Sequence, residues 1–171
     1  MERIAIDMDG VLADVSEQFL RWDERDFGKR KSWEEIAGME ERKAFPRCRE
    51  YVYSNGFFRT APVMEHSQEI LKKLNDQYEV FIVSAATEFP QSLAEKQEWL
   101  LEHFPFIQWQ QIVFCGIKTI INADMMIDDH FKNLDHFTGV TFLFSQPHNA
   151  YANDGRHKRV HSWPEIASIL L

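Results

Sequence analysis

Two carboxylates stand two positions apart near the start of the chain, directly after a short apolar run. These are Asp7 and Asp9, and Gly10 permits a sharp turn immediately after them. A carboxylate can attack phosphorus to give an aspartyl phosphate, which divides one slow hydrolysis into two faster steps. A neighbouring carboxylate can protonate the leaving oxygen and later deprotonate the attacking water. The pair therefore indicates phosphoryl-transfer chemistry.

Other sites that begin with closely spaced acids do not fit this segment. A calcium-binding EF-hand loop starting at Asp7 would need an acid or amide, a glycine and a glutamate where the chain has Val11, Leu12 and Gln18. The seven glycines are scattered, so neither a P-loop nor a dinucleotide-binding pattern occurs. Acids at strand ends are also common in α/β proteins without any catalytic role. The motif alone leaves that alternative open.

Three further polar groups follow other predicted strands. Ser84 could donate to a phosphoryl oxygen, Lys118 could neutralise phosphate, and Asp128 with Asp129 offers the hard oxygen ligands that Mg²⁺ prefers. Each has an ordinary explanation as well, because serine and aspartate cap helices and most lysines are surface charges. Their occurrence in the order Asp-x-Asp, Ser, Lys, Asp-Asp at four strand ends favours one phosphate and metal site.

The elements that would position these residues alternate between strand and helix. Strands are predicted over residues 3–7, 79–84, 111–115, 125–128 and 140–144. A helix is predicted over 92–104, opened by a Ser92 and Glu95 capping box, and another box at Ser162 and Glu165 opens a final helix ending near Leu171. This alternation predicts a doubly wound, mainly parallel α/β sheet covered on both faces.

One stretch interrupts the alternation. Residues 14–62 contain many charges, aromatics and helix formers but no convincing strand, and a helix is predicted from about 65 to 74. We expect residues 1–13 and 63–171 to form the α/β core, with residues 14–62 as a small helical cap inserted after the first strand. Such an insertion would cover the carboxyl end of the sheet, where ligands of open α/β folds bind, and act as a lid.

Composition limits the partners. The 171 residues, 44% of them hydrophobic, can bury one sizeable core. The 19 Lys and Arg against 27 Asp and Glu give a net charge of −8, which repels polymeric nucleic acid. No apolar run is long enough to span a bilayer, and Met1 leads straight into a strand-like segment, so we expect no membrane segment and no secretory signal. Cys48 and Cys115, the only cysteines, lack the pairing of a zinc or redox motif and suit a reducing compartment, so we expect a cytoplasmic location and a small-molecule partner. The sequence makes no prediction of oligomeric state.

Two clusters near the C-terminus are not assigned a site. His148, His157 and His161 lie close in sequence, but they have no cysteine or acidic partner at the usual zinc spacing. The basic run at residues 156–159 is predicted to be a solvated loop rather than a nucleic-acid patch.

Together the four motifs resemble those of the haloacid dehalogenase superfamily, nearly from end to end. Asp9 places the resemblance in the phosphatase branch, because dehalogenases lack the second acid. The chain most resembles the 5'(3')-deoxyribonucleotidases, which remove phosphate from deoxyribonucleoside monophosphates. This likeness is carried by residues 7–14 (DMDGVLAD), 80–82 (VFI), 127–129 (IDD) and 161–163 (HSW).

The resemblance implies roles for these residues. Asp7 is expected to be the nucleophile and Asp9 the general acid/base, while Ser84 and Lys118 hold the phosphoryl group. Mg²⁺ is the expected cofactor, with these groups around it: the Asp7 carboxylate, the Asp9 backbone carbonyl, Asp128 and, in support, Asp129. A Rossmann-like core, a helical cap and a nucleoside monophosphate substrate are also implied. Phe57 and Phe58 match an aromatic pair of the family cap.

The chain departs from that family at two places, and two other functions remain open. Val15 stands where relatives can carry an aromatic, and Gly116 and Ile117 replace polar residues beside Lys118. One alternative is a phosphatase of another small phosphomonoester, such as a sugar phosphate, because specificity depends on the cap. The second is a phospho-accepting signalling module. Receiver modules, however, place the paired acids first and the phosphorylated Asp later, and they have no such insertion.

Overall fold

A single six-stranded sheet organises the molecule. The computed structural model describes residues 1–171, and every pair of neighbouring strands in it is parallel. In chain order the strands are β1 (Arg3–Ile6), β2 (Glu79–Ser84), β3 (Ile112–Phe114), β4 (Met125–Asp128), β5 (Val140–Phe144) and β6 (Lys158–Val160). Their spatial order is β3-β2-β1-β4-β5-β6. The chain builds the sheet outward in one direction from β1 to β3 and in the other direction from β4 to β6, so the topological switch point, where open α/β sheets bind their ligands, lies between β1 and β4.

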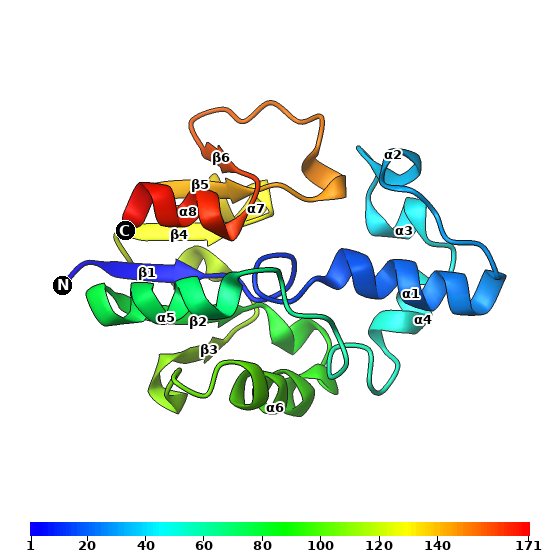
Figure 1. The fold of residues 1–171 in the computed structure, drawn as a ribbon, viewed down its shortest axis with the longest axis horizontal. Helices are drawn as coiled ribbons and strands as arrows, with labels where there is room; N and C mark the ends of the chain where they lie inside the picture. Colours follow the sequence, from blue (N-terminus) through cyan, green and yellow to red (C-terminus); the bar gives the residue numbers. More distant parts are fainter.

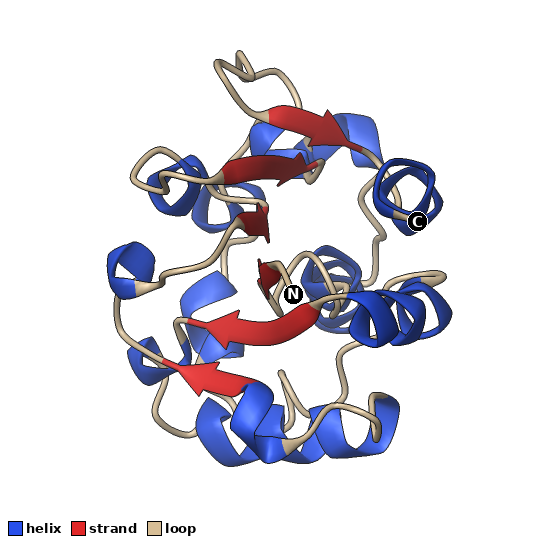
Figure 2. Ribbon diagram, turned by 90° about the vertical axis from the view of Figure 1, so that its left-hand side faces the viewer, coloured by secondary structure: helices blue, strands red, loops and turns tan.

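Helices cover both faces of the sheet (Figure 2). One face packs on α5 (Ser67–Gln77), α6 (Ser92–His103) and α8 (Trp163–Leu170), and the other packs on α7 (Phe131–Leu134). The strands alternate accordingly: Ile4 and Ile6 belong to the larger cluster of 23 buried residues, and Ala5 belongs to the opposite one. The predicted doubly wound arrangement is confirmed. No helix combines the length and the apolar character needed to cross a membrane.

Residues 14–62, which we call the cap, contain four helices. They are α1 (Val15–Phe27), α2 (Trp33–Ile36), α3 (Glu41–Ala44) and α4 (Cys48–Val52). In Figure 1 these helices lie together beyond the carboxyl ends of the strands, while both chain termini lie at the opposite end of the sheet. The cap has a hydrophobic cluster of its own, built around Phe19, Tyr51 and Phe57.

The two chain segments that enter and leave the cap run side by side. The Asp14 amide donates to the Pro62 carbonyl at 2.8 Å, and Ala13 pairs with Val63 in an antiparallel bridge. The Asp14 side chain also accepts from the Glu17 amide and so caps α1. These contacts fix the start of α1 next to the loop that carries Asp7 and Asp9.

Three local predictions differ from the structure. Lys158–Val160, expected within a solvated loop, forms edge strand β6 against β5. Ser92 and Glu95 make no capping box, because the Ser92 hydroxyl donates to the Ala86 carbonyl and Glu95 accepts from cap amides. Ser162 does cap α8, but Glu165 accepts from the His161 amide instead of closing the box.

Candidate active site

Residues from three strand ends meet beneath the cap. Lys118 begins a 3-10 turn after β3, and its Nζ lies 2.5 Å from Asp7 Oδ1 and 2.7 Å from Asp128 Oδ2. All three side chains are buried. Asp128 is held further by the His130 amide at 2.9 Å and by Asn133 Nδ2 at 3.0 Å. Gly116 and Ile117, where the chain departs from the family, leave Lys118 in contact with both carboxylates. The Ile117 side chain is 60% exposed.

The two carboxylates that share this ammonium differ in proton affinity. Burial, reinforced by Asp128 and Asp129, raises the pKa of Asp7 well above its usual range, against the opposing charge of Lys118. Burial acts on Asp128 too, but Lys118, Asn133 and the His130 amide lower the pKa of Asp128 below its usual value. Burial opposes the charge on Lys118, yet the two carboxylates raise its pKa. The site therefore needs more positive charge before Asp7 and Asp128 are both readily ionised.

The Asp129 carboxylate lies against the turn at Gly10. A Cβ atom on Gly10 would fall 2.4 Å from Asp129 Oδ2, and Gly10 has φ of 80°, so only glycine fits there. The Asp129 carbonyl accepts from Asn149 Nδ2 at 2.8 Å and from His148 at 3.0 Å. Its carboxylate oxygen Oδ1 is buried without a hydrogen-bond partner.

The carboxylates of Asp7, Asp128 and Asp129 fit a hard divalent cation. One oxygen from each lies within 4.8 Å of the others, and all three side chains are buried. The unpartnered Asp129 Oδ1 is a ligand atom that no protein donor satisfies. An oxygen-only set with room for water and substrate phosphate is what Mg²⁺ binds. The residues present therefore fit the expected magnesium ion.

A second lysine, which the sequence interpretation missed, holds Asp9 and Ser84. Lys96 of α6 is 1% exposed, its Nζ forms an ion pair with Asp9 Oδ2, and it lies 3.2 Å from Ser84 Oγ. The ammonium also lies 4.3 Å from the ring centroid of Phe58 in the cap. Asp9 Oδ1 is buried without a hydrogen-bond partner.

The sequence did contain a signal for Lys96. It stands four positions after Ser92 and four before Leu100, and all three belong to the buried face of α6. A lysine in the apolar stripe of a helix is rarely buried without a partner. A lysine on the buried face of this helix therefore indicates a carboxylate partner, and the strand-end acids were the candidates.

A cavity of about 300 Å³ lies between the carboxylates at the strand ends and the cap. Its floor is formed by Asp7, Asp9, Lys96 and Lys118. The apolar part of its wall comes from seven residues: Val15, Phe19, Cys48, Val52, Phe58, Ala85 and Phe89. A volume of this size, with an apolar wall and convergent polar groups, is typical of small-molecule sites.

The aromatic pair expected from the resemblance is divided between two tasks. Phe58 lines the cavity, whereas Phe57 is fully buried in the cap cluster against Phe19 and Trp22. The other conspicuous aromatics of the cap do not line the cavity, and Phe27, Trp33 and Tyr53 are about half exposed.

Comparisons with known proteins agree with this geometry. Residues 2–171 match the family model described as 5' nucleotidase, deoxy (pyrimidine), cytosolic type C protein. The chain is 42% identical over 174 residues to proteins named 5'(3')-deoxyribonucleotidase of Bacillus subtilis and of Bacillus phage SPbeta, covering 98% of each chain. These matches cover nearly the whole chain, so they favour the phosphatase interpretation over the signalling module.

Solved structures identify the same fold. The haloacid dehalogenase-like family protein SP0104 of Streptococcus pneumoniae superposes with a TM-score of 0.63 at 12% identity, covering 100% of this chain and 99% of that chain. The "putative HAD-hydrolase YfnB" of Bacillus subtilis, whose crystal structure contains bound magnesium, superposes with a TM-score of 0.59 at 14% identity, covering 99% of this chain and 98% of that chain. The fold expected from the resemblance is confirmed. The chain belongs to the family of 5' nucleotidase, deoxy (pyrimidine), cytosolic type C proteins and is a phosphoric monoester hydrolase of the 5'-nucleotidase type.

Proposed function

We propose that the protein dephosphorylates deoxyribonucleoside monophosphates, preferably pyrimidine ones, through an aspartyl phosphate on Asp7. The observation that carries this proposal is the cavity, which joins the paired carboxylates to an apolar wall supplied mainly by the cap. The floor suits a phosphate and the wall suits a planar base. The named activity of the full-length relatives supports the same substrate class.

In the first step, an oxygen of Asp7 attacks phosphorus while the bond to the nucleoside oxygen breaks. Lys118 and Ser84 hold the phosphoryl oxygens, and Asp9, which lines the cavity, gives a proton to the departing nucleoside oxygen. Lys96 keeps the Asp9 carboxyl in place through Oδ2.

In the second step, Asp9 takes a proton from water, and the water oxygen attacks the phosphorus of the aspartyl phosphate. The bond between phosphorus and the Asp7 oxygen breaks, which releases inorganic phosphate and regenerates the carboxylate. The same Asp9 thus acts first as an acid and then as a base.

Mg²⁺ would be held by the Asp7 carboxylate, the Asp9 backbone carbonyl and Asp128, with Asp129 in support. When bound, the ion neutralises the negative charge that the carboxylates and the substrate phosphate bring together. Asp128 is suited to this task because its low pKa keeps it ionised.

We expect phosphate release to depend on Mg²⁺ and to favour deoxyribonucleotides. Val15 lines the cavity beside Gly10 and Ser16, so an apolar wall there would leave a 2'-hydroxyl desolvated and unpaired. Such a mismatch disfavours the ribonucleotide by about tenfold to a hundredfold in kcat/KM. The measurement is kcat/KM for dUMP, UMP, dTMP and a panel of sugar phosphates, with Mg²⁺ and after exhaustive chelation.

The outcomes separate the parts of the proposal. Equal values for UMP and dUMP, or a preferred sugar phosphate, would overturn the deoxyribonucleotidase assignment and leave the phosphatase mechanism in place. Full activity after chelation would contradict the metal requirement, and Asp128→Asn should weaken both metal binding and turnover.

Replacing Lys96 by Met should lower kcat for dUMP by about 100-fold, because the carboxyl of Asp9 then loses the ammonium that positions it. Met keeps most of the volume of the buried stem. The matched control is Lys72→Met on the exposed side of α5, which should leave kcat unchanged.

A double-mutant cycle shows whether Lys96 acts through Asp9. In the Asp9→Asn background, Lys96→Met should cost little more, since the group it positions has already lost its function. Fully additive losses would show that Lys96 acts independently of Asp9.

A further inference from the structure

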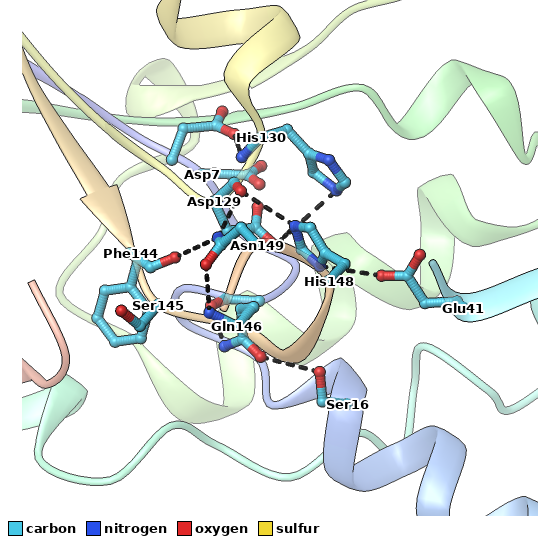
Figure 3. Close-up of polar contacts among 12 residues, drawn as sticks. Asp7, Ser16, Glu41, Asp129, His130, Phe144, Ser145, Gln146, His148 and Asn149 are labelled. Atoms are coloured by element: carbon cyan, nitrogen blue, oxygen red, sulfur yellow. Dashed lines mark hydrogen bonds and ion pairs between the residues drawn. The ribbon is translucent and has the colours of Figure 1, made fainter. Parts of the chain in front are cut away.

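A second set of metal-ligating side chains lies where the cap meets the core, beside the active site (Figure 3). Glu41 begins α3 of the cap, His130 follows Asp129 after β4, and His148 lies in the 3-10 turn η4 (Pro147–Asn149). One ligand atom from each lies within 4.8 Å of the others, and all three side chains are partly buried. The reaction described above uses none of them.

The imidazole of His148 is oriented as in a metal ligand. Its Nε2 lies 3.0 Å from the backbone carbonyl of Asp129, which can only accept, so this nitrogen carries the proton. Its Nδ1 then faces Glu41 Oε1 at 3.3 Å. Metal-ligating histidines commonly donate their second ring N–H to a carbonyl or carboxylate, which fixes the tautomer. His148 therefore presents Nδ1 toward Glu41 and the space between cap and core.

The surroundings of His148 favour positive charge. Its Nδ1 lies 3.3 Å from Glu41 Oε1, and its Nε2 lies 3.5 Å from Asp129 Oδ2. A cation bound at Nδ1 would be attracted by both carboxylates.

The separations match a zinc site after one side chain turns. Zinc bonds of about 2.0–2.2 Å to nitrogen and oxygen place tetrahedral ligands about 3.4 Å apart, close to the 3.3 Å between His148 Nδ1 and Glu41 Oε1. The two imidazoles are stacked, with centroids 4.3 Å apart and planes 12° from parallel. A metal must lie near the plane of each ring, so one ring has to rotate. His130 can do so, because its side chain is 40% exposed and its nearest acid, Asp129, is 3.8 Å away.

We propose that Glu41, His130 and His148 form a binding site for a zinc-class divalent transition metal ion that joins the cap to the core. Two imidazoles and one carboxylate suit Zn²⁺ or Co²⁺, whereas Mg²⁺ prefers the oxygen-only set around Asp7. Because Glu41 belongs to the cap and both histidines belong to the core, occupation of the site ties α3 to the sheet.

The test is zinc binding to the full chain by calorimetry in saturating Mg²⁺ without substrate, so its result does not depend on the proposed function. We expect one Zn²⁺ per chain, and a Co²⁺ form with visible absorption bands of a low-symmetry nitrogen and oxygen site. Loss of a group that merely supports a ligand costs about 10- to 100-fold in affinity. Removal of a ligand by His148→Ala should therefore cost at least about 100-fold, while His136→Ala, an exposed histidine elsewhere, should change nothing.

Amide hydrogen exchange tests the link between cap and core. Zn²⁺ should slow exchange in α3 of the wild-type chain but not in Glu41→Gln, a conservative change at a partly exposed position. Unchanged zinc affinity in the His130→Ala/His148→Ala double variant, or complete displacement of Zn²⁺ by Mg²⁺, would overturn the proposal. Zinc binding with no slowing of α3 exchange in the wild type would contradict the part played by Glu41.

Discussion

Asp7→Asn should reduce phosphate release from dUMP by about 10⁵-fold or more, to the level of background hydrolysis. An amide is a very poor nucleophile toward phosphorus. The other carboxylates near Asp7 cannot replace it, because Asp128 is held by Lys118 and Asn133, and Asp9 is held by Lys96. Steady-state phosphate release, with thermal unfolding to verify the fold, measures the effect.

The matched control for this change is Asp124→Asn. Asp124 precedes β4 at the opposite edge of the sheet, where its Oδ2 accepts from the Arg3 amide at 2.7 Å. The Asp124→Asn variant should keep the wild-type kcat for dUMP. Acid-quenched wild-type enzyme should carry phosphate on the peptide that contains Asp7, and Asp7→Asn should carry none. Near-wild-type hydrolysis by Asp7→Asn would remove Asp7 from its role.

Asp9→Asn should lower kcat for dUMP by about 10²–10⁴-fold, the usual size of a general acid/base effect. The loss should be smaller for p-nitrophenyl phosphate in the first step, because nitrophenolate leaves without needing a proton. Since hydrolysis of the aspartyl phosphate still needs a base, the phosphorylated enzyme should accumulate with that substrate. A burst of nitrophenolate followed by slow turnover is the expected record.

The comparison between the two substrates decides which step Asp9 serves. Equal losses without a burst would show that Asp9 acts in positioning or structure and not as the acid of the first step. Lys72→Met changes an exposed residue of α5, away from the active site, and again provides a reference variant with normal kcat for both substrates.

The sequence predicted the sheet well where strands are buried on both faces. Glu79–Ser84, Met125–Asp128 and Val140–Phe144 were predicted with their observed bounds, because continuous apolar runs bounded by polar residues are typical of parallel strands. Lys158–Val160 was missed because it is a three-residue edge strand that contains two cations. Its pairing depends on β5, the preceding strand, to which it is joined by an irregular connection.

The strand-end residues of the site could be predicted, since parallel strands bring their carboxyl ends to one edge. Lys96 could not be placed in the same way, because its contact with Asp9 depends on how α6 packs on the sheet. Glu95 shows the same limit: local spacing predicted a cap to its own helix, whereas it accepts from the amides of Gly56 and Arg59 in the cap. Both side chains make contacts with residues far away in the sequence.

The paired segments at Asp14 and Pro62 bear on how this architecture changes over evolutionary time. The chain leaves the core and returns to it through hydrogen-bonded neighbours, so the two ends of the helical insertion are as close together as the ends of a tight turn. Lengthening, shortening or exchanging the insertion adds little loop-closure entropy, which grows only slowly with loop length. The loop that carries Asp7 and Asp9 can therefore keep one geometry while the insertion varies, so that the substrate can change while the residues proposed for catalysis stay in place.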